Sequence, residues 1–496
     1  MASTAAWGQR AAPAQSDGAA AAALHSCRIT GYEHDAGCGV VRRPLDPAAP
    51  EGAKIDVHFA VLPALARNKQ PDPVFVFAGG PGQSAIDLAG SWSRLLARVG
   101  NRRDIVLVDQ RGTGRSAPLT CPELPAATPL AQIVPEAVQA ARLDACRAAL
   151  QRLPHGDLRQ YTTTIAMQDV EAVRQALGAA RINLVGASYG TRAALEFQRQ
   201  FPHAVRRLVI DGVAPPDMVL MSAFSTDNQA ALEAMLAACE RDAGGCARRH
   251  PALREAWQRL LSGLPREVTI VHPMSGVAER VVLTREVLLG WVRAPLYAPT
   301  LAAALPMALQ EAARGSFEPL VGLASGLAGP RTGLLAEGMH FSVVCAEDLP
   351  LLETGRGGDA SNTPGADFGR EFAQRYRQVC SAWPRGAVPP AFYGIPPAPA
   401  PALVLSGGAD PATPSRHGER VARLLGAKAR HAVVGEAGHG VMALPCMRDV
   451  LFRFIAAQTD DEAQAVKADC AAGVPRPPAF VPPGIVAPAG GKTGRP

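Results

Sequence analysis

The stretch INLVGASYGTRAALEF, residues 182–197, decides the fold of this chain. Its first residues are apolar and predict a buried strand, its middle is GxSxG, and the residues from Thr191 onward predict a helix. The glycines on either side of Ser188 let strand and helix approach closely, so that the serine occupies a sharp turn with its hydroxyl exposed. This pattern is typical of a nucleophile elbow and predicts acyl transfer through a serine ester. For GxSxG taken alone, an ordinary Gly-rich turn is the alternative.

An activated serine needs a base and an orienting carboxylate, and after an elbow these follow in the order acid, then histidine. The run PALVLSGGAD (401–410) predicts a buried strand with Asp410 at its carboxyl end, and HAVVGEAGHG (431–440) predicts a further strand followed by His439. We therefore expect Asp410 to be the orienting acid and His439 the general base. Asp211, at the end of an earlier predicted strand, is the rival acid. The short path from Asp410 to His439 favours Asp410.

The tetrahedral intermediate of acyl transfer needs two backbone N–H donors. Tyr189, directly after the serine, is expected to supply the first. The second is expected from the glycine-rich turn AGGPGQS (78–84), which follows the apolar run VFVF (74–77), and Gly80 is the best donor in it. A phosphate cradle is the alternative for this turn, but the turn lacks the Lys-Ser/Thr ending of a P-loop.

Five separated motifs now stand in order along the chain: GGPGQS (79–84), DQRGTGRS (109–116), GASYG (186–190), an aspartate after SGG (406–408), and GHG (438–440). Together they resemble the prolyl iminopeptidase and tripeptidyl aminopeptidase group of α/β hydrolases (TAP-like, peptidase S33-type), over most of residues 38–470. The resemblance implies an α/β-hydrolase fold, with a mostly parallel doubly wound sheet and an inserted helical cap. It also implies a serine aminopeptidase that releases proline or short N-terminal peptides. Prolyl iminopeptidases usually begin the oxyanion loop with His; Ala78 stands there, as in the secreted tripeptidyl-aminopeptidase-like branch.

Two further features bear on the substrate. In the related aminopeptidases, acidic groups on the cap side bind the free α-amine of the substrate. The run FSVVCAED (341–348) ends in two acids, and we expect Glu347 to take this role with Asp348 second, two solvated acids at a helix start being the alternative. Five aromatic residues are expected either to line an apolar pocket or to pack in the core: Trp92, Tyr189, Phe224, Trp291 and Tyr297.

The segment DQRGTGRSAP (109–118) also has the glycine spacing of a dinucleotide fingerprint. Its final proline would obstruct the helix that such a fingerprint opens. We expect a structural role instead, in which Asp109 and Arg111 brace the neighbouring oxyanion loop.

The composition is that of a globular enzyme. A chain of 496 residues with 48% hydrophobic residues can bury a large core, and its length suggests more than one domain. The net charge of +6 is modest and the arginines are dispersed, so nucleic-acid binding is not expected. No apolar run reaches the roughly 18 residues of a membrane helix, and no signal peptide is evident in the first 24 residues. The motifs call for no cofactor and no metal, and the expected partner is a peptide or a small ester or amide.

The ten cysteines come as neighbours in sequence: Cys27 with Cys38, Cys121 with Cys146, Cys239 with Cys246, Cys345 with Cys380, and Cys446 with Cys470. An even number with short loops predicts disulfides and hence an oxidising compartment, either secreted or periplasmic. Buried free thiols are one alternative. A zinc site of His25, Cys27, His34 and Cys38 is another, although this spacing fits no standard finger.

The order of the expected elements divides the chain into five parts: a flexible N-terminal segment (1–24), a first core part (25–215), a helical cap (216–399), a second core part with the acid and histidine (400–472), and a Pro- and Gly-rich tail (473–496). We expect the cap to decide the substrate, because the triad chemistry is generic.

A serine aminopeptidase is the favoured function, and an esterase or amidase for small molecules is the alternative. A non-catalytic hydrolase-like binding protein is disfavoured because all three triad positions are filled.

Overall fold

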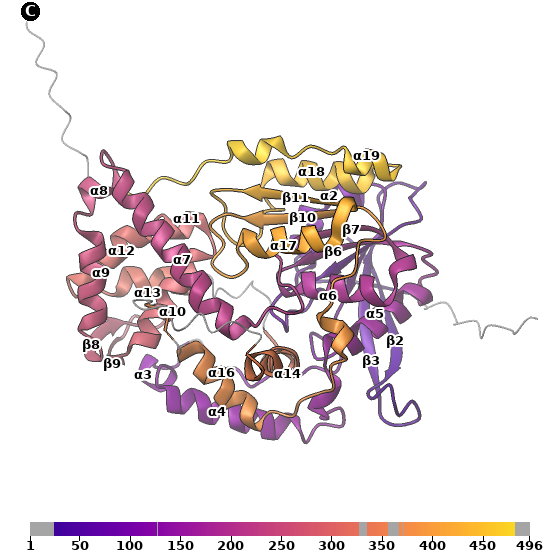
Figure 1. The fold of residues 1–496 in the computed structure, drawn as a ribbon. Helices are drawn as coiled ribbons and strands as arrows, with labels where there is room; N and C mark the ends of the chain where they lie inside the picture. The colour runs from indigo at the N-terminus through magenta and orange to yellow at the C-terminus, as the bar shows by residue number, and fades with distance from the viewer. Residues whose placement is uncertain (1–23, 126, 327–334, 356–366, 370, 482–496) are drawn as a thin grey trace, which may run out of the picture.

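A nine-stranded sheet forms the centre of the molecule in the computed structural model, which describes residues 24–125, 127–326, 335–355, 367–369 and 371–481 (Figure 1). The expected N-terminal segment, apart from its last residue, lies outside the described residues. So do residues 482–496 of the expected tail and two stretches of the expected cap, 327–334 and 356–366.

The strands of this sheet lie in the order β1-β2-β3-β5-β4-β6-β7-β10-β11. Their bounds are β1 (His25–Cys27), β2 (Ala36–Pro44), β3 (Lys54–Leu62), β4 (Val74–Phe77), β5 (Ile105–Val108), β6 (Ile182–Ala187), β7 (Val205–Asp211), β10 (Ala402–Gly407) and β11 (Ala429–Val434). The pairs β1–β2, β2–β3 and β3–β5 are antiparallel, and every pair from β5 to β11 is parallel. The structure therefore confirms the mostly parallel, doubly wound sheet.

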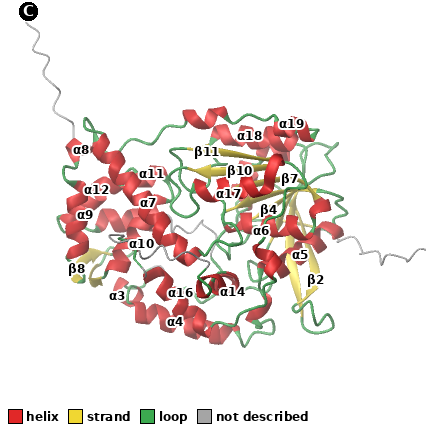
Figure 2. Cartoon of the chain, in the orientation of Figure 1, coloured by secondary structure: helices red, strands yellow, loops and turns green. Residues whose placement is uncertain are grey.

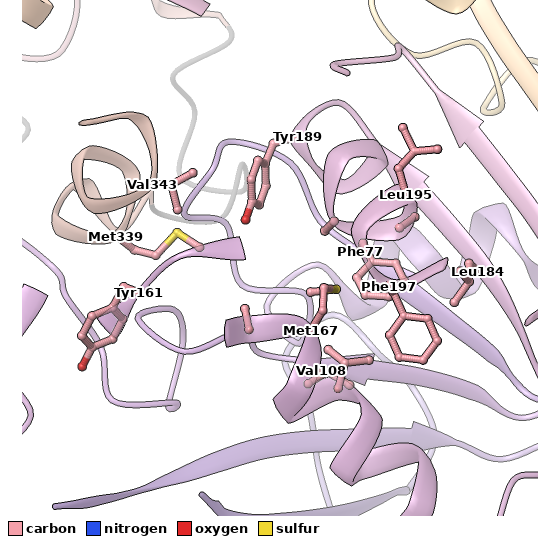
Figure 3. Close-up of a cluster of buried hydrophobic side chains, with 14 of the residues drawn as sticks. Phe77, Val108, Tyr161, Met167, Leu184, Tyr189, Leu195, Phe197, Met339 and Val343 are labelled. Carbon is pink, nitrogen blue, oxygen red and sulfur yellow. The ribbon is translucent and has the colours of Figure 1, made fainter. Parts of the chain in front are cut away.

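Helices cover both faces of the sheet, as the apolar parallel strands require. One face carries α5 (Thr163–Ala176), α6 (Tyr189–Gln200) and α17 (Ser415–Leu425); the other carries α1 (Ala89–Leu95), α2 (Ala97–Gly100) and α18 (Pro445–Ala456), with α19 (Asp460–Gln464) after it. Figure 2 shows α5, α6 and α17 on one side of the strands and α18 and α19 on the other. In the first layer, Phe197 of α6 packs with Phe77 and Leu184 of the sheet (Figure 3).

The segment between β7 and β10 forms a layer beside the sheet, on the left in Figure 1. Its helices are α7 (Leu220–Arg241), α8 (Cys246–Arg249), α9 (Leu253–Ser262), α10 (Arg285–Leu296), α11 (Pro299–Ala302), α12 (Leu305–Ala313), α13 (Glu318–Ser325), α14 (Glu337–Glu347), α15 (Leu349–Glu353) and α16 (Glu371–Ala382). An antiparallel hairpin of β8 (Arg266–Val271) and β9 (Ala278–Leu283) interrupts the expected helical pattern. Much of this layer has its own hydrophobic cluster, around Trp257, whereas Met339 and Val343 of α14 pack into the core of the sheet layer (Figure 3).

Two segments from the expected core and tail also reach this inserted layer. The helices α3 (Leu130–Ile133) and α4 (Glu136–Leu150) precede α5 in the chain, but α3 lies against β9 and α4 lies beside α16 (Figure 1). After the short helix η6 (Asp469–Gly473), the chain crosses to the layer, where the Phe480 N–H donates to the Ala303 carbonyl at 2.8 Å. The remaining short helices are η1 (Leu158–Gln160), η2 (Pro202–Ala204), η4 (Pro390–Tyr393) and η5 (Gly426–Lys428).

Disulfides join all ten cysteines in the five predicted pairs: Cys27–Cys38, Cys121–Cys146, Cys239–Cys246, Cys345–Cys380 and Cys446–Cys470. The sulfurs of Cys27 and Cys38 are therefore bonded to each other and are not available to zinc. In the described ranges, no helix is both long and apolar enough to cross a bilayer.

Candidate active site

Ser188 occupies the sharp turn between β6 and α6. Its φ of 56° lies in the left-handed region, where a residue with a side chain is strained. A Cβ added to Gly186 would lie 2.4 Å from the Gly190 carbonyl oxygen, and one added to Gly190 would lie 2.1 Å from the Phe77 carbonyl oxygen. Only glycine fits at both positions, so strand and helix meet closely. The turn has the geometry expected of a nucleophile elbow.

Asp410 and His439, on the loops after β10 and β11, are hydrogen-bonded to each other. The Nδ1 atom of His439 lies 2.8 Å from Asp410 Oδ2. An ionised carboxylate only accepts, so Nδ1 carries the proton and Nε2 is left as an acceptor. Asp410 also accepts from the N–H groups of Ala412 and Thr413, at 2.8 and 2.9 Å, and from the Thr413 hydroxyl at 2.9 Å. These bonds fix the carboxylate and, through it, the imidazole ring.

The pairing moves the two pKa values apart. Burial by itself would raise the pKa of Asp410, but the charge and hydrogen bond of His439, together with the backbone donors, hold that pKa below its ordinary value. Burial would lower the pKa of His439, but the charge and hydrogen bond of Asp410 and the charge of Asp211 raise it above its ordinary value, with Arg293 acting in the opposite direction. The site therefore stabilises the imidazolium that forms when His439 accepts a proton.

Asp211, the rival acid, ends β7 but makes no hydrogen bond to His439. Its Oδ2 accepts from the Met442 N–H at 2.7 Å, and its Oδ1 has no hydrogen-bond partner among the described residues. Burial raises its pKa to about 6. The structure thus brings Asp410, and not Asp211, into contact with the histidine.

The glycine-rich turn after β4 lies against the elbow. A Cβ added to Gly79 would lie 3.1 Å from Ser188 Cβ. Gly80 has a φ of 109°, which favours glycine, and Tyr189 is the first residue of α6, where an N–H has no partner within the helix. Within the described ranges, neither N–H donates to another loop or turn carbonyl. Both are therefore free to meet an oxyanion.

Asp109 holds this turn in place. Its Oδ1 accepts from Ser84 Oγ at 2.6 Å and from the Ile86 N–H at 3.1 Å, and burial raises its pKa to about 6. Arg111 points elsewhere and pairs with Asp169 of α5 at 2.7 Å. The expectation that both residues brace the oxyanion loop is right for Asp109 and wrong for Arg111.

His340 of α14, which no sequence motif marks, contacts the same turn from the inserted layer. Its Nδ1 donates to the Pro81 carbonyl at 3.2 Å, since a carbonyl only accepts, and its Nε2 then accepts from the Tyr376 hydroxyl at 2.9 Å. Burial lowers the pKa of His340 to about 4, so the ring is neutral at neutral pH. The turn that carries Gly80 is thus supported from both sides.

Ser188 and His439 line one cavity of about 680 Å³. Its other wall is formed by residues of the inserted segment: Phe224, Arg293, Tyr297, Leu335, Glu337, His340, Phe341, Phe372, Arg375 and Tyr376. Of the five aromatic residues considered above, four line the cavity and Trp291 does not.

Glu347 and Asp348 do not line this cavity, so the expectation that they meet a substrate amine is corrected. Both side chains are 0% exposed, and Arg192 of α6 pairs with them at 3.3 and 2.7 Å. Glu347 also accepts from the Thr163 N–H at 2.7 Å, and Asp348 accepts from the Leu220 N–H at 2.9 Å. The two acids turn inward because they neutralise a buried arginine. They are not solvated acids at a helix start either.

The described part of the chain holds no group of three or more His, Cys, Asp or Glu side chains arranged to bind a metal ion. The segment 109–118 forms turns where a dinucleotide fingerprint would open a helix. The arrangement around Ser188 suits covalent acyl transfer: a strained serine, a histidine held by a carboxylate, and two free N–H groups.

Two family models match the chain. One, described as alpha/beta hydrolase fold, matches residues 72–267 and includes the oxyanion turn and the elbow. The other, described as TAP-like protein, matches residues 365–466 and includes Asp410 and His439. The fold of this chain is that of the α/β hydrolases.

Relatives of this α/β hydrolase include named peptidases. The tripeptidyl aminopeptidase of Streptomyces coelicolor is 31% identical over 195 residues, which are 36% of this chain and 35% of that protein. The serine protease Hip1 of Mycobacterium tuberculosis is 25% identical over 415 residues, 78% of this chain and 79% of that protein. The proline iminopeptidase of Xylella fastidiosa is 27% identical over 146 residues, 29% of this chain and 34% of that protein.

The match to the Streptomyces proteins spans about a third of their length. These relatives confirm the resemblance of the chain to the tripeptidyl aminopeptidase and prolyl iminopeptidase group.

Proposed function

We propose that this α/β hydrolase is a serine peptidase that cleaves near a free N-terminus and releases proline or short N-terminal peptides. One observation carries the proposal: the His439–Asp410 hydrogen bond of 2.8 Å lies beside an elbow that presents Ser188 to the same cavity. The names of its relatives, two kinds of aminopeptidase and a serine protease, support peptide bonds as the substrate.

In the proposed mechanism, Ser188 Oγ attacks the scissile carbonyl carbon while His439 Nε2 takes its proton. Asp410 keeps the imidazole in the required tautomer and stabilises the imidazolium. The N–H groups of Gly80 and Tyr189 bind the oxyanion of the tetrahedral intermediate. His439 then donates the proton to the leaving amine, and a water molecule that it activates hydrolyses the acyl-enzyme.

The test compares three substrates of one peptide sequence: its p-nitroanilide with a free amine, the N-acetylated p-nitroanilide, and the methyl ester with a free amine. An aminopeptidase binds the free amine of its substrate, and one charge-assisted contact of that kind corresponds to a preference of about ten- to a hundredfold in kcat/KM. Glu347 and Asp348 do not supply that contact, since neither lines the cavity. Equal rates with the free and the N-acetylated peptide would contradict the aminopeptidase proposal. Ester turnover without peptide cleavage would favour the esterase or amidase alternative.

We also propose that the protein works in an oxidising compartment, secreted or periplasmic, because all ten of its cysteines are paired in disulfides. Protein taken from its native host and denatured without reductant should show almost no titratable thiol. Ten free thiols under those conditions would contradict the proposal.

A further inference from the structure

Arg293 of α10 lines the cavity, and its guanidinium group lies over three aromatic rings. Its guanidinium carbon lies 4.6 Å from the ring centroid of Phe224, 5.2 Å from that of Phe372 and 5.6 Å from that of Tyr297. Its Nη2 donates to the Tyr297 hydroxyl at 3.2 Å. Arg293 lines the same cavity as Ser188. Three rings therefore hold the cation at the edge of the site.

The charge of Arg293 has no counterion within the described part of the chain: none of the described carboxylates lies within 4.0 Å of its guanidinium. Arg192 shows the ordinary arrangement for a buried arginine, with carboxylates at 2.7 and 3.3 Å. Aromatic faces attract a cation without neutralising it, and a guanidinium has five N–H donors. Arg293 thus retains both unpaired charge and spare donors.

The other charged groups of the cavity wall do not cancel this charge. Glu337 forms two hydrogen bonds with Arg142, at 2.5 and 2.7 Å, and so is already paired. Asp211 is fully buried and hydrogen-bonded to the backbone. Arg375 is exposed on α16 and adds a second positive charge. A ligand that enters the cavity therefore meets net positive charge on this wall.

Arg293 also lies close to the reacting groups. Tyr297, about one helical turn further along the chain, packs edge-on against the His439 ring, with centroids 5.2 Å apart. The Tyr297 carbonyl accepts from the main-chain N–H of His439 at 2.9 Å. A group held by Arg293 is therefore within reach of a short peptide bound at Ser188.

We propose that Arg293 binds a carboxylate of the substrate, so that the enzyme selects short peptides with a carboxylate near the scissile bond. This inference rests on the serine peptidase proposed above and names its substrate class. A guanidinium can donate two parallel hydrogen bonds to the two oxygens of a carboxylate, and the surrounding rings shield those bonds from water. The carboxylate is the free C-terminus of a short peptide or an acidic side chain.

Binding to the Ser188→Ala protein tests the proposal without turnover. Three probes are titrated calorimetrically: tetra-alanine, its C-terminal amide, and the amide of Ala-Ala-Glu-Ala. We expect the Kd of tetra-alanine to be about ten- to a hundredfold lower than that of its amide. Adding Arg293→Gln should remove the difference, and Arg293→Lys should restore part of it, because lysine keeps the charge without the parallel donors. Arg377→Gln is the matched control: this exposed arginine of α16 does not line the cavity, so the ratio should stay unchanged.

The probes also identify the source of the carboxylate. Tight binding of the glutamate-containing amide would assign a side chain, and tight binding of tetra-alanine alone would assign the C-terminus. Equal Kd values for tetra-alanine and its amide, or no binding of any probe, would overturn the proposal. It would also fall if Arg293→Gln weakened the acid and the amide alike, because a residue that only clamps aromatic rings would behave in that way.

Hydrolysis by the parent enzyme distinguishes a failure of the carboxylate site from a failure of the proposed peptidase activity. Hydrolysis of tetra-alanine and its amide at equal kcat/KM would keep the peptidase and remove the carboxylate site. An intact binding preference without hydrolysis of either peptide would keep the carboxylate site and remove the peptidase.

Discussion

The two walls of the cavity around Ser188 are built in different ways. On the core side, Ser188, Asp410 and His439 each follow a parallel strand of one sheet, so the carboxyl edge of that sheet gathers them. On the opposite side, Arg293 and His340 stand within helices of the inserted segment. The first wall depends on strand order and short loops, and the second on how helices pack. In the proposed mechanism, the first wall carries the chemistry and the second wall selects the substrate.

Two arginines sharpen this contrast. Arg192, behind the core wall, has two carboxylate partners and no access to the cavity. Arg293, on the inserted wall, has aromatic neighbours and access to the cavity. A paired arginine holds the fold together, whereas an arginine without a counterion is available to a ligand. Four predictions test the difference between the walls.

The largest effect is expected from Ser188→Ala on the core wall. The covalent route disappears while the oxyanion donors remain, so kcat should fall by about 10⁴- to 10⁶-fold. Thermal unfolding should show an unchanged fold, and a fluorophosphonate should add its mass to the parent but not to the variant. A rate within tenfold of the parent would refute the nucleophile assignment.

Asp410→Asn should come next, with a loss of about 10³- to 10⁴-fold in kcat, because the amide favours the wrong tautomer of His439. Asp211→Asn is the matched change, since it removes a second buried carboxylate near the same ring. It should cost less than about tenfold. Steady-state kinetics on both variants ranks the two acids, and the reverse order would make Asp211 the orienting residue.

Glu347→Gln should affect folding rather than specificity. It weakens a buried cluster around Arg192, so the free energy of unfolding should fall by about 1–3 kcal/mol. Urea denaturation measures this loss, and the ratio of rates on free and N-acetylated peptides should not change. Glu353→Gln removes an exposed partner of Arg385 and should cost less than about 1 kcal/mol. If Glu347→Gln lost the preference for the free amine, Glu347 would have to contact the substrate amine.

The smallest effect is expected in the pH profile. His439 must be neutral to act as a base, so kcat/KM falls as the pH drops through the pKa of that ring. The charge of Arg293 lowers this pKa, and the charge of Asp211 raises it. Arg293→Gln should therefore move the acid limb to higher pH, and Asp211→Asn should move it to lower pH. The ratio of kcat/KM at about pH 6 to that at about pH 8 should change by about two- to tenfold in opposite directions. Shifts of the same sign would contradict this electrostatic account.

Local patterns were enough to predict the core wall. An apolar run that ends in glycines and a polar residue marks a buried strand and its loop, which is why Asp410, His439 and the turn at Gly80 could be placed from the sequence. The elbow is equally local, since the glycines that permit its close contacts lie two residues from Ser188. The parallel sheet followed from the same strands.

The inserted wall could not be predicted in this way. Glu347 follows an apolar run and looks solvated, but its partner Arg192 lies 155 residues earlier in the chain. His340 contacts Pro81 across 259 residues. The β8–β9 hairpin was missed because its short strands mix charged and apolar residues between stretches with helical periodicity. In each case the deciding contact is set by tertiary packing.

The disulfides have a consequence for biosynthesis. In chain order, the first cysteine is bonded to the second, the third to the fourth, and so on, so no two of the closed loops overlap. The widest sequence separation is 35 residues. A chain that enters an oxidising space with its N-terminus first exposes both members of a pair before the next pair begins. Joining cysteines in their order of arrival then yields the native set without isomerisation. If the protein is exported as proposed, the order of its cysteines lets the covalent framework assemble one closed loop at a time.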